Sequence, residues 1–242
     1  MSLFKELRSL VEKETSGLNL KKVRRAYEFA AKAHEGQFRV SGEPYIVHPV
    51  ETAKILAKLH VDEDTVIAGL LHDVPEDTSY TLEDVEKEFG KHVAQLVFAL
   101  TKLSKVHYKH SMGERQIQSL QRMFIETADD PRVIVIKLSD RLHNMRTLQY
   151  LRPEKQQRIA RETLEVFVPL ANLFGIFELR YQLEDLCFFY LQPEEYARIE
   201  SYVHDHDLKR KKHIERAVKM LKVRLSKSAL RARLEGRSKH FY

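Results

Sequence analysis

Apolar residues recur at spacings of three and four along most of this 242-residue chain, a period that fits the α-helix and excludes most other structure. The chain has only eight glycines, and no stretch alternates apolar and polar residues for the length of a strand. The sequence therefore predicts an all-α fold of about ten helices. We expect them near residues 3–14, 20–35, 48–60, 63–74, 82–103, 112–128, 131–149, 153–174, 177–191 and from 193 onward.

Local signals mark where these helices begin and end. Thr81-Leu-Glu-Asp84 resembles a capping box. Prolines in first-turn positions and glycines at turns or helix ends add further marks, at Pro49, Pro131, Pro193, Gly36, Gly90 and Gly175. Residues 36–47 contain two glycines and a proline, so we expect a structured loop that leads into His48, the kind of segment that often carries function.

The charge is unevenly distributed along the chain. Residues 208–242 hold 13 Lys or Arg against two glutamates, a net charge of +11. Subtracting these from the totals of 41 basic and 35 acidic residues leaves 28 and 33, or −5, for residues 1–207. The body of the chain is therefore mildly acidic and the tail strongly basic. Because a long charged helical segment begins at Pro193, we expect a helical domain over residues 1–192 and a basic helical extension over residues 193–242.

The composition, 43% hydrophobic and 31% charged, is typical of a globular protein without a membrane segment. No run reaches the ~18 apolar residues that a membrane helix needs, and the first residues lack the apolar stretch of a signal peptide. The cytoplasm is therefore the expected location. Cys187 is the one cysteine, and we expect it to be a small apolar residue of the core.

In the segment Gly69–Thr78, an acidic pair, Glu76-Asp77, follows an adjacent His-Asp pair after two intervening residues. On a continuous helix, Glu76 would lie one turn beyond His72 and Asp77 one turn beyond Asp73. All four side chains would then share one wall of a pocket. This arrangement predicts a metal site with its own acid or base.

A second polar row lies in the segment 131–147. Its members, Lys137, Asp140, Asn144 and Thr147, repeat the spacing of an apolar row formed by Val135, Leu138, Leu142 and Met145. A solvated helix face explains the polar row equally well on spacing alone. Residues 133–138 are otherwise apolar, however, and a buried helix with a polar row usually lines a cavity.

Together, His48, His72, Asp73 and Asp140 supply two imidazoles and two carboxylates. Such a set suits Mn²⁺, Fe²⁺ or Zn²⁺ with positions open for water and substrate, and the lack of cysteine partners argues against a closed structural zinc site. A bound ion would polarise a phosphoryl oxygen and lower the pKa of its water. Single histidines are more often structural, so the prediction depends on the loop and the polar row occurring together.

Three motifs resemble the HD-type hydrolase domain of the RelA/SpoT (Rel) alarmone enzymes. They are Arg39–Pro49, Leu70–Thr78 and Lys137–Thr147, in that order, and the similarity continues through Leu151–Lys155 and Arg158–Glu165. It covers roughly residues 20 to 190. The last seven residues, Gly236–Tyr242, resemble the start of the synthetase domain that follows in bifunctional members, so a C-terminal synthetase domain is an expected partner in a longer protein.

The resemblance implies an HD-domain helical bundle and Mn²⁺-dependent hydrolysis of guanosine 3′,5′-bis(diphosphate), ppGpp, and of pppGpp. Pyrophosphate would leave the 3′ position, with GDP or GTP as the other product. The resemblance also implies roles for single residues. The ligands of one metal ion are matched by His48, His72, Asp73 and Asp140, and the catalytic acidic pair by Glu76 and Asp77. The nucleotide pocket is matched by Arg39, Ser41, Asn144 and Thr147, and Lys137 and Arg141 are further candidates for phosphate contact or for bracing the site. Pro75 departs from the family pattern and predicts a kink between the ligands and the acidic pair.

Two other functions stay open at the level of sequence. One is an HD phosphohydrolase that acts on a dNTP, a nucleoside monophosphate or NADPH; the loop from Arg39 to Tyr45 and the turn from Asn144 to Thr147 favour the guanine alarmone instead. The other is a non-catalytic regulatory or nucleic-acid-binding module that uses the basic tail. No aromatic residues alternate with the basic residues of the tail before Phe241, and the tail contains no nucleic-acid-binding motif. These features favour the interpretation that the tail does not bind nucleic acid.

Overall fold

The computed structural model describes residues 3–15, 17–104, 129–226 and 234. Within these residues the regular structure is entirely helical, apart from an isolated bridge between Phe38 and Pro44, and the predicted all-α class is confirmed. The helix predicted over 112–128 and the final segment 236–242 lie outside the described residues.

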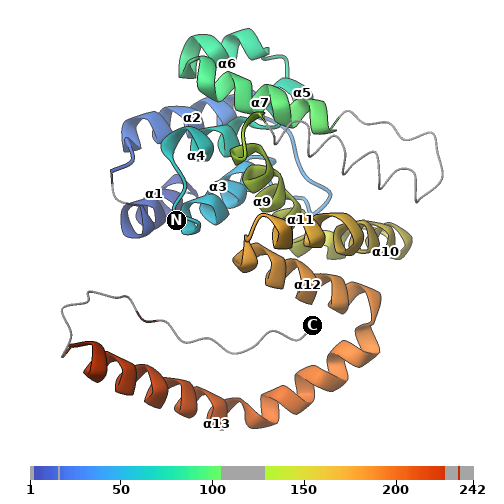
Figure 1. The fold of residues 1–242 in the computed structure, drawn as a ribbon. Helices are drawn as coiled ribbons and strands as arrows, with labels where there is room; N and C mark the ends of the chain where they lie inside the picture. The colour runs from blue at the N-terminus through green and yellow to red at the C-terminus, as the bar shows by residue number, and fades with distance from the viewer. Residues whose placement is uncertain (1–2, 16, 105–128, 227–233, 235–242) are drawn as a thin grey trace.

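Figure 1 shows the order of the described helices along the chain. They are α1 (Leu3–Glu14), α2 (Leu20–Ala33), α3 (Val47–Lys58), α4 (Glu63–Leu71), α5 (Val74–Asp77), α6 (Leu82–Phe89), α7 (Lys91–Ser104), α9 (Arg132–Arg146), the short η1 (Leu148–Tyr150), α10 (Pro153–Glu162), the π-helical turn η2 (Thr163–Phe167), α11 (Val168–Leu173), α12 (Phe177–Leu191) and α13 (Pro193–Ser226).

Four of the predicted helices were wrong in their continuity. The helix predicted over 131–149 ends at Arg146 and is followed by the separate 3₁₀ helix η1. The segment predicted as one helix over 82–103 is two helices. The first, α6, begins at a complete capping box formed by Thr81 and Asp84, and it ends at Gly90, whose φ is 91°. The helix predicted over 63–74 ends at Leu71 and is followed by the separate α5. The helix predicted over 153–174 contains the π-helical turn η2 between α10 and α11.

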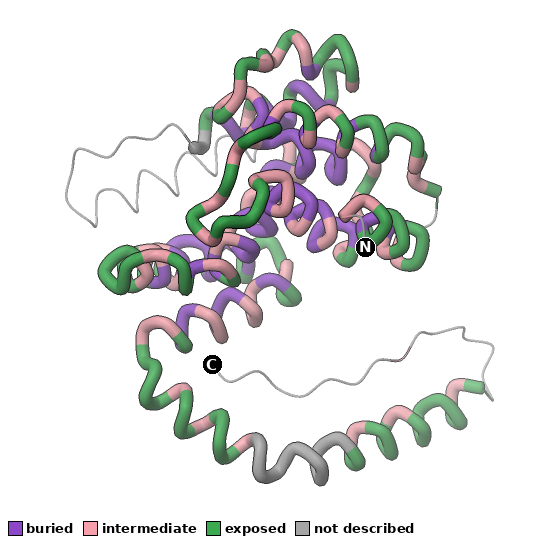
Figure 2. The backbone as a smooth tube through the Cα atoms, turned by 180° about the vertical axis from the view of Figure 1, so that it is seen from behind, coloured by how far each residue is buried: buried purple, intermediate pink, exposed green. Residues whose placement is uncertain are grey.

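The core lies where α3, α4 and α9 meet. Figure 2 shows the longest buried stretches of the backbone in this region, whereas α13 is mostly exposed or intermediate. Val50, Leu56, Ile67 and Leu70 are among its buried side chains. Because α3, α4 and α9 also carry the candidate ligands, the best-packed part of the protein holds the site.

Gly69 sets how closely α3 approaches α4. A Cβ atom at this position would lie 2.4 Å from Cδ1 of Leu56, a fully buried side chain with little room to move. We expect Gly69→Ala to lower the free energy of unfolding, because an overpacking cost of ~1–3 kcal/mol exceeds the ~1 kcal/mol that alanine gains in helix propensity. Urea denaturation measures the change, with the exposed Ser79→Ala as control. A more stable Gly69→Ala variant would contradict this packing.

Cys187 is buried on α12, as the sequence predicts, and burial raises the pKa of its thiol to about 12. At pH 8 the reactive thiolate is therefore scarce and shielded. We expect the native protein to resist a thiol reagent such as iodoacetamide, and the protein unfolded in guanidinium to take up one equivalent. Rapid labelling of the native protein, followed by mass spectrometry, would show that this part of α12 opens readily.

The helix α13 follows α12 after Gln192 and begins at Pro193, the proline predicted in a first-turn position. Tyr196 contacts Phe188 and Phe189 with ring centroids 5.7 and 5.2 Å apart, which anchors the first turns of α13 on α12. Tyr202, Met220 and Val223 are exposed farther along. Within the part of the chain that the structure describes, no helix is both long and apolar enough to cross a membrane.

Candidate metal centre and nucleotide pocket

The four candidate ligands come from the ends or the middle of three core helices. His48 is the second residue of α3, directly after the loop 36–46. His72 and Asp73 follow the last residue of α4, and Asp140 lies within α9. Each of these helices has many buried side chains that pack in the core, so the cluster has rigid support.

The acidic pair does not continue the helix of the ligands. Pro75 has no N–H to donate to the carbonyl of Leu71, and Leu71 is the last residue of α4. A new helix, α5, begins instead, in which the backbone N–H groups of Glu76 and Asp77 donate to the carbonyl of Asp73 at 3.1 and 2.9 Å. The continuous helical wall predicted from the sequence is therefore wrong, and the kink predicted at Pro75 is confirmed.

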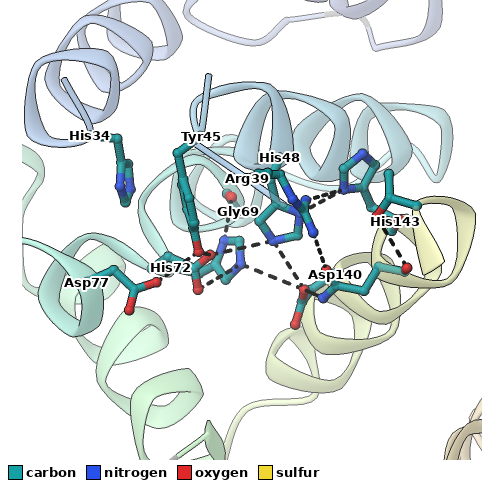
Figure 3. Close-up of polar contacts among 12 residues, drawn as sticks. His34, Arg39, Tyr45, His48, Gly69, His72, Asp77, Asp140 and His143 are labelled. Carbon is teal, nitrogen blue, oxygen red and sulfur yellow. Dashed lines mark hydrogen bonds and ion pairs between the residues drawn. The ribbon is translucent and has the colours of Figure 1, made fainter. Parts of the chain in front are cut away.

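The imidazole and carboxylate groups converge on one small volume (Figure 3). Nε2 of His48 lies 3.3 Å from Oδ1 of Asp140 and 3.5 Å from Oδ2 of Asp73. Nε2 of His72 lies 3.2 Å from Oδ1 of Asp73 and 4.0 Å from Oδ1 of Asp140. One ligand atom from each of His48, His72 and Asp140 lies within 4.8 Å of the others, as a shared ion requires.

His72 shows that these residues fit a metal ion. Its Nδ1 lies 2.9 Å from the carbonyl oxygen of Gly69, which can only accept, so Nδ1 carries the proton and Nε2 has a lone pair. Among the described residues, this buried Nε2 has no hydrogen-bond partner. A buried, unpartnered lone pair aimed at two carboxylates is what a divalent cation would satisfy.

The electrostatics favour the ionised carboxylates of Asp140 and Asp73 and the neutral ring of His48, the forms that bind a metal. Burial raises the pKa of Asp140, but the Lys137 ammonium at 2.8 Å and the neighbouring histidines outweigh it and hold that pKa well below its usual value. Burial alone would raise the pKa of Asp73, but the interactions with His72 and His48 outweigh burial, so the pKa of this carboxyl is lowered. Burial lowers the pKa of His48, which favours the neutral ring.

A cavity of about 450 Å³ opens beside Asp140. The polar row of α9 lines it, so the prediction that this row faces a cavity is confirmed, while Leu138, Leu142 and Met145 of the apolar row are buried. The exposed side chains of Phe38, Val40 and Tyr150 stand among its lining. Every sequence-predicted nucleotide residue is in this lining: Arg39, Ser41, Lys137, Arg141, Asn144 and Thr147.

Arg39 reaches from the loop to α9. Its two terminal nitrogens lie 3.1 Å from Nδ1 of His143 and 2.8 Å from Oδ1 of Asn144. Asn144 in turn donates from Nδ2 to Oδ1 of Asp140 at 2.5 Å. The loop, the pocket and a candidate metal ligand are thus joined by consecutive hydrogen bonds.

Two other predicted residues have partners of their own. Arg141 contacts Glu162 at 3.3 Å and stacks over the ring of Phe167 at 3.9 Å, so its guanidinium is directed toward α10 and η2. This placement favours the bracing role over phosphate contact. Ser41 donates to Glu43 within the loop at 3.2 Å.

The acidic pair is tied to the ligands through Tyr45. The Tyr45 hydroxyl lies 2.8 Å from Oδ2 of both Asp73 and Asp77, so one hydroxyl joins a candidate ligand to a candidate acid. Asp77 is exposed, and its backbone carbonyl accepts from Nε2 of Gln37. Glu76 is half-buried in the same short helix.

Sequence reasoning missed Tyr45 and His143 as members of the site. His143 is buried one turn after Asp140 on α9, and its Nδ1 lies 2.7 Å from Nδ1 of His48. Burial, His48 and Arg39 lower the pKa of His143 to about 3, so the ring is neutral. The sequence did contain a signal for each residue. His143 lies three positions after Asp140 on the same predicted helix, and Tyr45 lies three positions before His48.

Comparison with known proteins matches this geometry to a family. A family model described as an HD domain matches residues 26–177. A solved structure, described as a metazoan orthologue of SpoT that hydrolyses ppGpp, matches 71% of this chain and 96% of its own, with 31% identity and a TM-score of 0.55. The chain belongs to the RelA/SpoT family of HD domains.

Longer relatives of this HD domain carry more than one activity in their descriptions. The chain is 45% identical over its full length to the bifunctional (p)ppGpp synthase/hydrolase SpoT of Escherichia coli, of which it covers 34%. It is 44% identical over 91% of its length to a GTP pyrophosphokinase of Myxococcus xanthus, of which it covers 29%. The chain thus spans about a third of the length of the curated relatives it matches.

Proposed function

We propose that this HD domain hydrolyses ppGpp and pppGpp at the 3′ position, with pyrophosphate and GDP or GTP as products. The longer relatives carry descriptions of both synthesis and hydrolysis, so they do not separate the two. The metazoan orthologue is almost wholly covered by this chain and is described as hydrolysing ppGpp. That observation carries the proposal, because the shared part is the HD domain that contains the His48, His72 and Asp140 cluster.

The metal we propose is a single Mn²⁺ ion held by His48, His72, Asp73 and Asp140. Mixed imidazole and carboxylate donors suit this ion, and the described residues near the cluster supply no thiolate. When bound, the ion would polarise a phosphoryl oxygen and make a nearby water more acidic. The pKa values of Asp73, Asp140 and His48 are all lowered, so these three side chains favour their deprotonated forms before any ion arrives.

The guanine nucleotide would lie in the cavity lined by the loop and α9. Arg39 and Ser41 would contact it from the loop, and Asn144 from α9 and Thr147 from the end of that helix. Lys137 lies 2.8 Å from Asp140, so its ammonium is at the junction of the cavity and the ligand cluster, where the 3′-phosphates would be placed. Burying part of the nucleotide here would orient the reacting phosphorus and exclude bulk water.

Glu76 and Asp77 would transfer the protons of the reaction. The oxygen of a water molecule bonds to the phosphorus attached to O3′, the bond from that phosphorus to O3′ breaks, and O3′ accepts a proton. One carboxylate of the pair would take the proton of the water and the other would donate to O3′. The bridge from Tyr45 to Asp73 and Asp77 holds this pair beside the ligands.

The test is a nucleotide panel assayed with Mn²⁺. We expect ppGpp to yield GDP and pyrophosphate in equal amounts and EDTA to stop the reaction. GTP, a dNTP, a nucleoside monophosphate and NADPH serve as comparison substrates. Lack of pyrophosphate release from ppGpp would overturn the proposal, and faster turnover of another nucleotide would assign the HD domain to that substrate.

We also propose that residues 1–192 form the hydrolase domain and that residues 193–242 lead toward a synthetase domain in the longer relatives. The start of α13 at Pro193 and the length of those relatives support this division. The exposed apolar residues Tyr202, Met220 and Val223 on the described part of α13 also suit a helix that packs on another domain better than one that binds nucleic acid.

A further inference from the structure

His143 has no role in the reaction described above, yet it contacts the candidate ligand His48 directly. The two Nδ1 atoms lie 2.7 Å apart, and the ring centroids are 4.9 Å apart at an interplanar angle of 38°. Figure 3 shows His143 beside His48, on the side of the ring that faces away from Tyr45. Both histidines are at most 5% exposed, so no bulk water competes for this contact.

The direction of this hydrogen bond follows from Arg39. A guanidinium can only donate, and its Nη1 lies 3.1 Å from Nδ1 of His143. Nδ1 of His143 is therefore an acceptor, and the proton between the two rings belongs to Nδ1 of His48. With its proton on Nδ1, neutral His48 has its lone pair on Nε2, the atom that lies beside Asp73 and Asp140.

The two candidate imidazole ligands are thus oriented by different groups. His72 donates from Nδ1 to a backbone carbonyl, that of Gly69, which no substitution of a side chain removes. His48 donates from the same ring position to a side chain. An ordinary buried histidine fills space and satisfies its own polar atoms, whereas His143 also sets which nitrogen of its neighbour can bind a metal.

We propose that His143 is a positioning residue for the metal ligand His48, and that Arg39 keeps it in the accepting state. The inference rests on the metal site of the proposed function and adds a link from the nucleotide loop to that site. Loss of the acceptor leaves the His48 ring free to rotate or to carry its proton on Nε2, so metal affinity falls although all four ligands remain.

The test compares two substitutions of His143. His143→Leu fills the volume but accepts no hydrogen bond, whereas His143→Asn places an acceptor oxygen, Oδ1, near the position of Nδ1. Leu142→Ala is the matched control, because it also disturbs the buried part of α9 at a side chain that has no polar atom to hydrogen-bond a candidate ligand. Thermal melts in EDTA give the stability of each variant without metal.

Mn²⁺ affinity, followed by the loss of the free Mn²⁺ signal in electron paramagnetic resonance, is the readout. We expect His143→Leu to bind Mn²⁺ roughly 10–100-fold more weakly, with His143→Asn and Leu142→Ala within about threefold of the wild type. Unchanged affinity in His143→Leu, or equal losses in both His143 variants, would overturn the positioning role alone. Wild-type protein that binds no Mn²⁺ would overturn the metal site as well, whereas Mn²⁺ binding without ppGpp hydrolysis would overturn only the proposed reaction.

Discussion

Replacing Glu76 by Gln, or Asp77 by Asn, is expected to lower kcat for ppGpp by roughly 10²–10⁴-fold, the usual contribution of a positioned acid or base. The amides keep the shape of the acids but take up no proton at neutral pH. In the Asp77→Asn variant the amide oxygen can still accept from Tyr45, whose hydroxyl lies 2.8 Å from the carboxylate in the wild type. The loss would therefore come from proton transfer and not from displacement of α5.

Mn²⁺ affinity separates this role from a role as ligand. Both variants should bind the ion within about twofold of the wild type, because a group that only transfers protons contributes little to the binding of the metal. Glu83→Gln is the control, since Glu83 is exposed at the start of α6 and makes no contact with the cluster. Weakened Mn²⁺ binding together with lost turnover would mean that Glu76 or Asp77 is a ligand and that their assignment is wrong.

The limits of the helices were largely predictable where local signals decide them. The capping box at Thr81 and the bounds of α1 and α12 follow from residues only a few positions apart. The interruption after Leu71 was harder to place, because the apolar period continues through it and only Pro75 signals a change. The π-helical turn η2 has no local sequence signal that we can identify, since its extra residue is accommodated by packing.

The candidate site was predictable to the extent that its residues occur in motifs. His48, His72 and Asp140 were grouped from sequence, and the structure brings their ligand atoms together. Tyr45 and His143 were not found, because their partners in the site lie 28 and 95 positions away in the chain. A hydrogen bond across such a separation depends on how helices pack, which no local pattern records.

Asp140→Asn is expected to abolish detectable Mn²⁺ binding and to destabilise the metal-free protein. The second effect comes from Lys137, whose ammonium lies 2.8 Å from the Asp140 carboxylate while only 16% of its side chain is exposed. Removing one partner of a buried ion pair costs about 3–5 kcal/mol, and the attraction that remains between Lys137 and Asp73, with the partial exposure of Lys137, puts the loss near the lower end, about 3 kcal/mol. Urea denaturation in EDTA measures it, and Mn²⁺ titration measures the loss of binding.

The double variant Lys137→Met with Asp140→Leu separates the two effects. It replaces the pair by apolar side chains of similar shape, so neither member of the pair is left as an unpaired charge and most of the stability should return. Mn²⁺ binding should not return, because the carboxylate that faces His48 and His72 is still missing. If Asp140→Asn were as stable as the wild type without metal, Lys137 would be compensated by other groups, and the pair would serve the metal site alone.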